Sequence, residues 1–257
     1  MDARDAMAAA RRITALTGAG VSTDSGIPDF RGPRGVWTAL GREFTMDGYL
    51  TDPAVRRAAW QARATHPMWT AEPNAAHRAL AELERAGRVR ALLTQNVDRL
   101  HQRAGSVAVV ELHGSLTGTV CVDCGATGAM SAALDRVRAG EDDPDCGACG
   151  GILRSTTVAF GQPLDADVLR AARTAALDCD LMLVAGTSLL VEPAASLVGL
   201  AAQAGAAVVI CNKEPTPYDG VATAVVRGPV GVSLPALVAV PVVGSGPVRT
   251  WGDPSTW

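Results

Sequence analysis

Residues Thr17 to Gly32 read T-G-A-G-V-S-T-D-S-G-I-P-D-F-R-G and follow a short apolar segment at Ile13–Leu16. This combination predicts a buried strand that ends in a glycine-rich turn. Gly18, Ala19 and Gly20 carry little or no side chain, so the phosphate groups of a ligand could approach the backbone closely there.

The same stretch departs from the dinucleotide fingerprint of dehydrogenases. Thr23 occupies the position at which that pattern requires its third glycine. The turn continues into an acid, an aromatic residue and an arginine, namely Asp29, Phe30 and Arg31. This set is typical of a site for a charged nucleotide and argues against simple hydride transfer.

Five short apolar runs predict buried parallel strands. They are Ile13–Leu16, Val89–Leu93, Val107–Leu112, Leu181–Ala185 and Ala207–Ile210. Helical segments separate them: one is expected over Ala75–Arg85 after an Asn74 cap, and another from Pro193 to near Gly205. Alternating strands and helices predict an α/β fold with a doubly wound, Rossmann-like parallel sheet.

A polar motif follows each predicted strand. Because ligands bind outside the carboxyl ends of parallel strands, these motifs should meet in one crevice. They are Gln95, Asn96 and Asp98; His113; Gly186, Thr187 and Ser188; and Asn212. An imidazole is well suited to accept a proton near neutral pH, so His113 is a candidate base. Asn96 and Asp98 could alternatively cap a loop.

Two C-x-x-C pairs predict a structural zinc site. Cys121 and Cys124 are separated from Cys146 and Cys149 by 21 residues, slightly more than the usual spacing. Four thiolates would complete a tetrahedral shell and leave no position for water. A redox pair or ordinary buried thiols are the alternatives. The other two cysteines lie in apolar segments and are expected in the core.

Composition restricts the class of protein. The 257 residues include 48% hydrophobic and 19% charged residues and carry a net charge of −3, which gives no electrostatic reason to expect nucleic-acid binding. No signal peptide or membrane span is expected, because acids interrupt the N-terminus and Glu192, Pro193 and Gln203 interrupt the longest apolar region. A cytoplasmic monomer is expected.

The histidines other than His113 are less informative. His66 and His77 are expected either to pack in the interior or to face solvent, and the sequence leaves the role of His101 open.

The motifs together resemble the sirtuins, the NAD-dependent protein deacylases, over Thr14 to about Val230. The resemblance implies an NAD-binding Rossmann-like domain that contains two insertions. Residues 1–30, 74–118 and 155–257 would form that domain, 31–73 a cofactor-binding loop and helical lid, and 119–154 the zinc module.

The resemblance also implies roles for individual residues. His113 would be the general base and Asn96 a second catalytic residue, with Asn96 and Asp98 in the nicotinamide pocket and Gln95 on the nicotinamide ribose. The remaining NAD contacts would come from the glycine turn with Asp29, Phe30 and Arg31, and from Gly186, Thr187, Ser188, Asn212 and Val230.

In such enzymes the acyl-lysine oxygen displaces nicotinamide from NAD, and the base then activates a ribose hydroxyl that attacks the acyl carbon. An ADP-ribosyltransferase, an NAD glycohydrolase and a non-catalytic NAD-binding regulator are the alternatives, although a regulator would be expected to lack His113 or Asn96.

Val158, Phe160 and Gly161 resemble the acyl-peptide-binding strand of the family, but Gln162 replaces its usual acid. Trp60 and Arg63 stand where sirtuins that remove acidic acyl groups have Tyr-x-x-Arg. Arg63 could pair with an acyl carboxylate or lie on a solvated helix face; acetyl is the expected acyl group and succinyl the alternative.

Overall fold

The computed structural model describes residues 1–29 and 45–239. Phe30 and Arg31, both predicted NAD contacts, therefore lie outside the described residues. Within those two ranges, each helix is too short or too polar to span a membrane.

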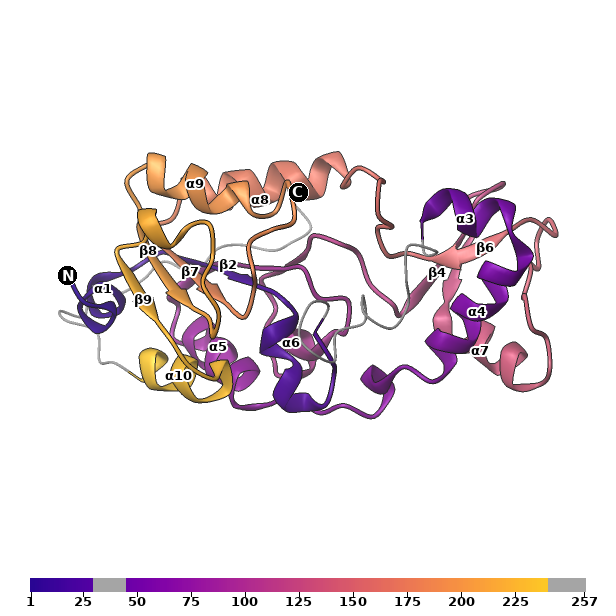
Figure 1. The fold of residues 1–257 in the computed structure, drawn as a ribbon, viewed down its shortest axis with the longest axis horizontal. Coiled ribbons are helices and arrows are strands. Elements are labelled where there is room, and N and C mark those ends of the chain that lie inside the picture. The colour runs from indigo at the N-terminus through magenta and orange to yellow at the C-terminus, as the bar shows by residue number, and fades with distance from the viewer. Residues whose placement is uncertain (30–44, 240–257) are drawn as a thin grey trace.

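The main sheet has six parallel strands in the order β3-β2-β1-β7-β8-β9 (Figure 1). Their bounds are β1 Ile13–Thr17, β2 Val89–Thr94, β3 Val109–Glu111, β7 Leu181–Ala185, β8 Ala207–Cys211 and β9 Ala224–Val226. The five predicted strands are confirmed, and the doubly wound order reverses between β1 and β7. The sequence analysis missed β9, because this edge strand has only three residues and no fully buried side chain.

Helices cover both faces of the sheet. Three helices share one hydrophobic core with it: α1 Ala3–Ala9, α5 Ala75–Arg85 and α10 Val230–Val238. Two others cover the opposite face: α8 Ala166–Leu177 and α9 Ser196–Gln203. Figure 1 shows α8 and α9 along one side of the sheet and α5 and α10 along the other. With both faces covered, continuous apolar strands are the expected pattern.

The helix boundaries test two predictions. Asn74 caps α5 as predicted, because its side-chain oxygen accepts hydrogen bonds from the backbone N–H groups of Ala76 and His77. The prediction that Pro193 opens the second helix is wrong, because α9 begins at Ser196. The residues before it form turns, in which Ala195 N donates to Val191 O and Leu197 N donates to Ala194 O.

A smaller lobe lies beside the main sheet (Figure 1). It contains an antiparallel sheet in the order β5-β4-β6 and three helices. The bounds are β4 Gly118–Cys121, β5 Thr127–Ala129, β6 Leu153–Ser155, α3 Met46–Thr51, α4 Pro53–Ala64 and α7 Met130–Arg138. Trp60 of α4 packs in one apolar cluster with Met130 and Leu134 of α7. The predicted lid helices and zinc module therefore share a core, although they are far apart in sequence.

Candidate active site

The carboxyl ends of the central strands meet through backbone hydrogen bonds. Gly20 N donates to Gly186 O at 2.8 Å, and Gly18 N donates to Ala185 O at 3.2 Å. The turn after β2 joins them, because Gln95 N donates to Thr17 O at 3.0 Å. The structure therefore brings the turns after β1, β2 and β7 together at one edge of the sheet.

The glycines in these turns have a packing role that the sequence analysis did not foresee. A Cβ atom on Gly18 would lie 2.7 Å from Thr187 Cβ, and one on Gly20 would lie 2.9 Å from Gly186 Cα. Gly186 has a φ of +61°, and its Cβ would lie 2.4 Å from Val21 N. The space that these glycines leave is filled by the neighbouring backbone and by the Cβ atom of Thr187. Glycine is therefore required here by the contact between two turns, whatever ligand binds above them.

Ser22 connects the predicted nicotinamide-pocket residues. Its hydroxyl donates to Asp98 Oδ2 at 2.6 Å and accepts a hydrogen bond from Asn96 Nδ2 at 3.1 Å. Asn96 Nδ2 also donates to Gly18 O at 3.1 Å, and Asp98 Oδ1 accepts from Leu100 N at 2.9 Å. All three polar side chains are buried. This network fixes the orientation of the Asn96 amide and the Asp98 carboxylate, and Asp98 also has the loop-capping role considered from sequence.

His77 completes this network from α5. Its Nδ1 accepts the backbone N–H of Asn74 at 3.3 Å, so the proton of the neutral ring is on Nε2. Nε2 lies 3.4 Å from Ser22 Oγ and can donate a long hydrogen bond to it. The side chain is fully buried, so His77 does not face solvent, and its hydrogen bonds connect it to the candidate site as well as to the core.

His113 is half-buried at the end of β3. Its Nδ1 lies 3.1 Å from the carbonyl oxygen of Gln95. A carbonyl can only accept, so Nδ1 carries the proton and Nε2 keeps its lone pair. Burial lowers the pKa of the imidazole, while the hydrogen bond to the Gln95 carbonyl raises it. The ring is therefore a neutral base with a fixed tautomer near neutral pH, as general-base chemistry requires.

The predicted peptide-binding segment runs beside His113. Val158 N donates to His113 O at 2.9 Å, and Phe160 is 47% exposed. The side chain of Gln162 turns back on its own loop, where Oε1 accepts from Ala159 N at 3.2 Å. Val158 and Ala159 are half-buried, whereas Phe160 and Gly161 are exposed to solvent.

Arg63 lies in an aromatic environment in the smaller lobe. Its guanidinium carbon is 5.0 Å from the Trp60 ring centroid and 5.2 Å from that of Tyr49. Long hydrogen bonds of 3.4 Å join Arg63 to Tyr49 Oη and to Ser155 Oγ. Arg63 does not lie on a solvated helix face. Trp60 is fully buried, so its side chain supports Arg63 and is not exposed for a substrate contact.

The four paired cysteines form a metal-binding cluster. Cys121 Sγ lies 3.6 Å from Cys149 Sγ, Cys124 Sγ lies 3.7 Å from Cys146 Sγ, and all four sulfurs are within 4.8 Å of one another. A tetrahedral zinc ion with sulfur ligands at about 2.3 Å places those sulfurs roughly 3.8 Å apart. The donor set therefore fits a structural zinc ion. The long spacing between the pairs is explained by β5 and α7, which lie between them.

The remaining predicted residues occupy varied positions. The amide of Gln95 donates to Thr187 Oγ1 at 3.0 Å, which links two of the predicted NAD-binding turns. Asn212 is buried after β8, and its Nδ2 donates to Glu214 O at 2.8 Å. Val230 is buried in the main core at the start of α10. Cys179 and Cys211 are buried, as expected.

Sequence reasoning missed three groups that organise the site. Ser22 was not singled out, although its hydroxyl joins Asn96 to Asp98. Thr17 and Thr94 were not singled out, although their hydroxyls are 2.9 Å apart at the ends of two adjacent strands. A polar residue that directly follows an apolar strand was the available signal for both threonines.

The comparisons with known proteins identify the family. The Sir2 family model matches residues 18–193, and the chain is 51% identical over 231 residues to NAD-dependent protein deacetylase 2 of Streptomyces coelicolor. That alignment covers 88% of this chain and 96% of the relative. The chain belongs to the Sir2 family.

Solved Sir2 structures share the fold of this Sir2 protein. A Sir2 complex with p53 peptide and NAD+ has a TM-score of 0.84 at 37% identity, over 91% of this chain and 94% of the other. A Sir2 variant with deacetylated p53 peptide and 3'-O-acetyl-ADP-ribose has a TM-score of 0.85 at 37% identity, over 93% and 97% of the two chains. The sirtuin resemblance noted from the sequence is thereby confirmed.

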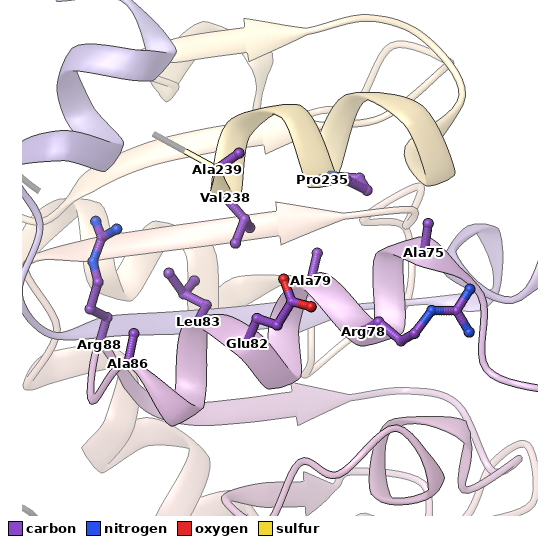
Figure 2. A pocket seen from close by; sticks show the side chains of 10 residues that line it. All are labelled: Ala75, Arg78, Ala79, Glu82, Leu83, Ala86, Arg88, Pro235, Val238 and Ala239. Carbon is purple, nitrogen blue, oxygen red and sulfur yellow. The ribbon is translucent and has the colours of Figure 1, made fainter. Parts of the chain in front are cut away.

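A groove of about 450 Å³ lies elsewhere on this Sir2 protein, between α5 and α10 (Figure 2). Alanine, leucine, valine and proline side chains form most of its walls, with Arg78 and Arg88 toward opposite ends. None of the predicted NAD or substrate residues lines it. The hydrogen-bonded polar groups at the strand ends are the candidate active site of this Sir2 protein.

We expect acid to destabilise the folded protein through its histidines. Burial lowers the pKa of His77 to about 4, and it lowers the pKa values of His66, His101 and His113 below the ordinary 6.5. As pH falls below 6.5, the unfolded chain binds protons that the folded chain does not, so stability is lost as pH falls toward 4. Each such histidine contributes a slope of up to about 1.4 kcal/mol per pH unit.

Urea unfolding between pH 7.5 and 4.5 would measure this slope. The His101→Gln variant should show a smaller slope than the parent protein, because it lacks one of these four histidines. An unfolding free energy that stays constant from pH 6.5 to 4.5 would contradict the prediction.

Proposed function

We propose that this chain removes acetyl groups from protein lysines in an NAD-dependent reaction that yields nicotinamide, free lysine and O-acetyl-ADP-ribose. One observation carries the proposal: His113 has its Nδ1 proton committed to the Gln95 carbonyl, which leaves Nε2 as a base beside the Asn96–Asp98 turn. The named deacetylase relative, and the Sir2 complexes with p53 peptide, NAD+ and acetyl-ADP-ribose, support the same reaction.

We assign NAD to the crevice at the ends of β1, β2, β7 and β8. Asn96 and Asp98 would face nicotinamide, and Gln95 the adjacent ribose. The backbone N–H groups of the two glycine turns would bind the phosphates. Further contacts are assigned to Asp29, Phe30, Arg31, Thr187, Ser188, Asn212 and Val230. The observed link from Gln95 to Thr187 supports a shared site, because it joins the assigned nicotinamide and phosphate regions.

The proposed reaction has two chemical steps, and different side chains assist each of them. The Ser22 network holds Asn96 and Asp98 rigid while the acyl oxygen of the substrate displaces nicotinamide from the ribose carbon. His113 Nε2 then takes the proton of a ribose hydroxyl, whose oxygen attacks the acyl carbon. One water molecule is consumed overall when the lysine amine is released. The ADP-ribosyl group of NAD ends in the ester, so NAD is a substrate.

We place the acylated peptide beside Val158, Phe160 and Gly161. Val158 is already bonded to His113 through the backbone, so a peptide along this segment would present its acyl-lysine near the base. Arg63 is proposed to face the acyl group, and Trp60 to support it through the ring contact. Acetyl is the proposed group. A succinyl carboxylate is the alternative that Arg63 would favour, because a guanidinium binds carboxylates strongly.

The test is an assay with NAD and matched acetyl-lysine and succinyl-lysine peptides, in which peptide mass and nicotinamide are followed together. Deacetylation with stoichiometric nicotinamide release is expected. Arg63→Met should reduce turnover of the succinyl peptide more than that of the acetyl peptide if Arg63 faces the acyl group. Nicotinamide release with both peptides unchanged would instead indicate a glycohydrolase or ADP-ribosyltransferase.

We expect the protein to act in the cytoplasm, as a monomer, on protein substrates. No feature of its net charge of −3 favours a nucleic-acid partner.

A further inference from the structure

His101 is a buried histidine that the proposed reaction does not use. It is the second residue of α6, Leu100–Arg103, and its side chain is 1% exposed. Burial lowers its pKa well below that of an exposed histidine, so the ring is neutral near pH 7. A neutral imidazole has one N–H and one lone pair, and the structure shows where each of them lies.

The N–H of His101 begins a chain of hydrogen bonds that ends at the candidate nicotinamide pocket. His101 Nε2 lies 3.0 Å from Thr17 Oγ1, and Thr17 Oγ1 donates to Thr94 Oγ1 at 2.9 Å. The single hydroxyl proton of Thr17 is thereby committed, so His101 Nε2 must donate. Thr94 Oγ1 also accepts the backbone N–H of Asn96 at 3.1 Å.

The other nitrogen of His101 makes the residue costly for the fold. Its Nδ1 is buried without a hydrogen-bond partner among the described residues. An unpartnered buried polar atom is destabilising, and an apolar side chain of similar size would avoid this penalty. Leucine could fill the same space without this penalty. Histidine at position 101 is therefore explained by the hydrogen bond that Nε2 donates.

His101 and His77 hold Asn96 from two sides. The two rings lie against each other, with centroids 4.8 Å apart and planes tilted by 58°. His77 contacts Ser22, which accepts the side-chain amide of Asn96, whereas the His101 chain ends on the backbone N–H of Asn96. The backbone and the side chain of Asn96 are thus held by two different sets of hydrogen bonds.

We propose that His101 is a positioning residue that fixes Asn96, through Thr17 and Thr94, for the step in which nicotinamide leaves. The proposal rests on the proposed function, because it assigns Asn96 to the nicotinamide pocket. His101 touches no reacting atom in this scheme and acts only through the two threonines.

The test compares two substitutions that differ in the donor. His101→Leu removes it, whereas the side-chain amide of His101→Gln can still donate to Thr17. We expect His101→Leu to reduce kcat roughly 10- to 100-fold, as small displacements of positioned groups do, with little change in KM for the acetyl peptide. His101→Gln should recover most of kcat. Equal losses in both variants, or full activity in His101→Leu, would overturn the proposal.

A double-mutant cycle with Thr17→Val tests the path. If His101 acts through Thr17, the double variant His101→Leu/Thr17→Val should be no slower than the slower single variant. Losses in kcat that multiply would show that His101 acts by another route. Thermal unfolding of each variant tests the alternative that His101 only stabilises the fold. In that case the loss of kcat should parallel the loss of stability, and glutamine should not restore kcat.

Amide hydrogen exchange separates failure of this inference from failure of the proposed function. The Asn96 backbone N–H should exchange faster in His101→Leu than in His101→Gln, whatever reaction the protein catalyses. If the parent protein lacks deacylase activity, the proposed function fails, while the exchange result still decides whether His101 positions Asn96. Unchanged exchange at Asn96 would overturn the inference even in an active enzyme.

Discussion

His113→Ala should lose deacetylation by about 100- to 10,000-fold, the range expected when a general base is removed. The physical reason is the fixed tautomer: Nδ1–H is bonded to the Gln95 carbonyl, and Nε2 is the only nitrogen of this ring that can accept a proton. Because this base acts after nicotinamide has left, exchange of labelled nicotinamide into NAD should continue in the variant. Product mass and label incorporation, measured in parallel, would check both parts.

His113→Asn is the matched control for this result. Its side-chain amide can still donate to the Gln95 carbonyl, as Nδ1 does, but it offers no basic nitrogen. It should therefore fold with the Val158 contact intact and be as inactive as alanine. Recovery of deacetylation in His113→Asn would show that His113 holds the strand ends in place and does not act as a base.

Removal of zinc should unfold the smaller lobe and abolish activity. Structural zinc sites contribute about 10–16 kcal/mol of apparent binding free energy at pH 7, and among the described residues of the lobe the apolar cluster around Trp60 and Met130 is small. Loss of zinc would also release the Tyr49 hydroxyl, which donates to Leu153 O at 2.7 Å. It would release the segment that leads to Val158 as well. The side of the site that is proposed to bind the peptide depends on both.

Metal analysis of the purified protein should give one zinc per chain. Cys146→Ser should lose the metal and the thermal transition of the lobe, whereas Cys211→Ala, a buried cysteine of the main sheet, should keep both. The same loss is expected after treatment with a strong chelator. A metal-free protein with unchanged unfolding temperature and activity would exclude a structural zinc role for the four cysteines.

The sequence by itself determined the features that depend on short-range patterns. Five strands, the Asn74 cap and the clustering of the four cysteines were predicted correctly, because apolar runs, caps and C-x-x-C pairs are each set by residues close together in the chain. The same patterns placed Gln95, Asn96, Asp98 and His113 directly after strands. Parallel order then implied that these side chains meet, since the carboxyl ends of such strands share one edge of the sheet.

Only the tertiary structure decided which of those side chains bond to one another. Ser22 lies 76 residues from Asp98 and 55 from His77, and no local pattern specifies a hydrogen bond over such distances. Trp60 shows the same limit: a motif placed it near substrate, but packing against α7 buried it. Partners distant in sequence are chosen by the geometry of the complete fold, because hydrogen bonding and close packing depend on positions in space that a short stretch of sequence does not set.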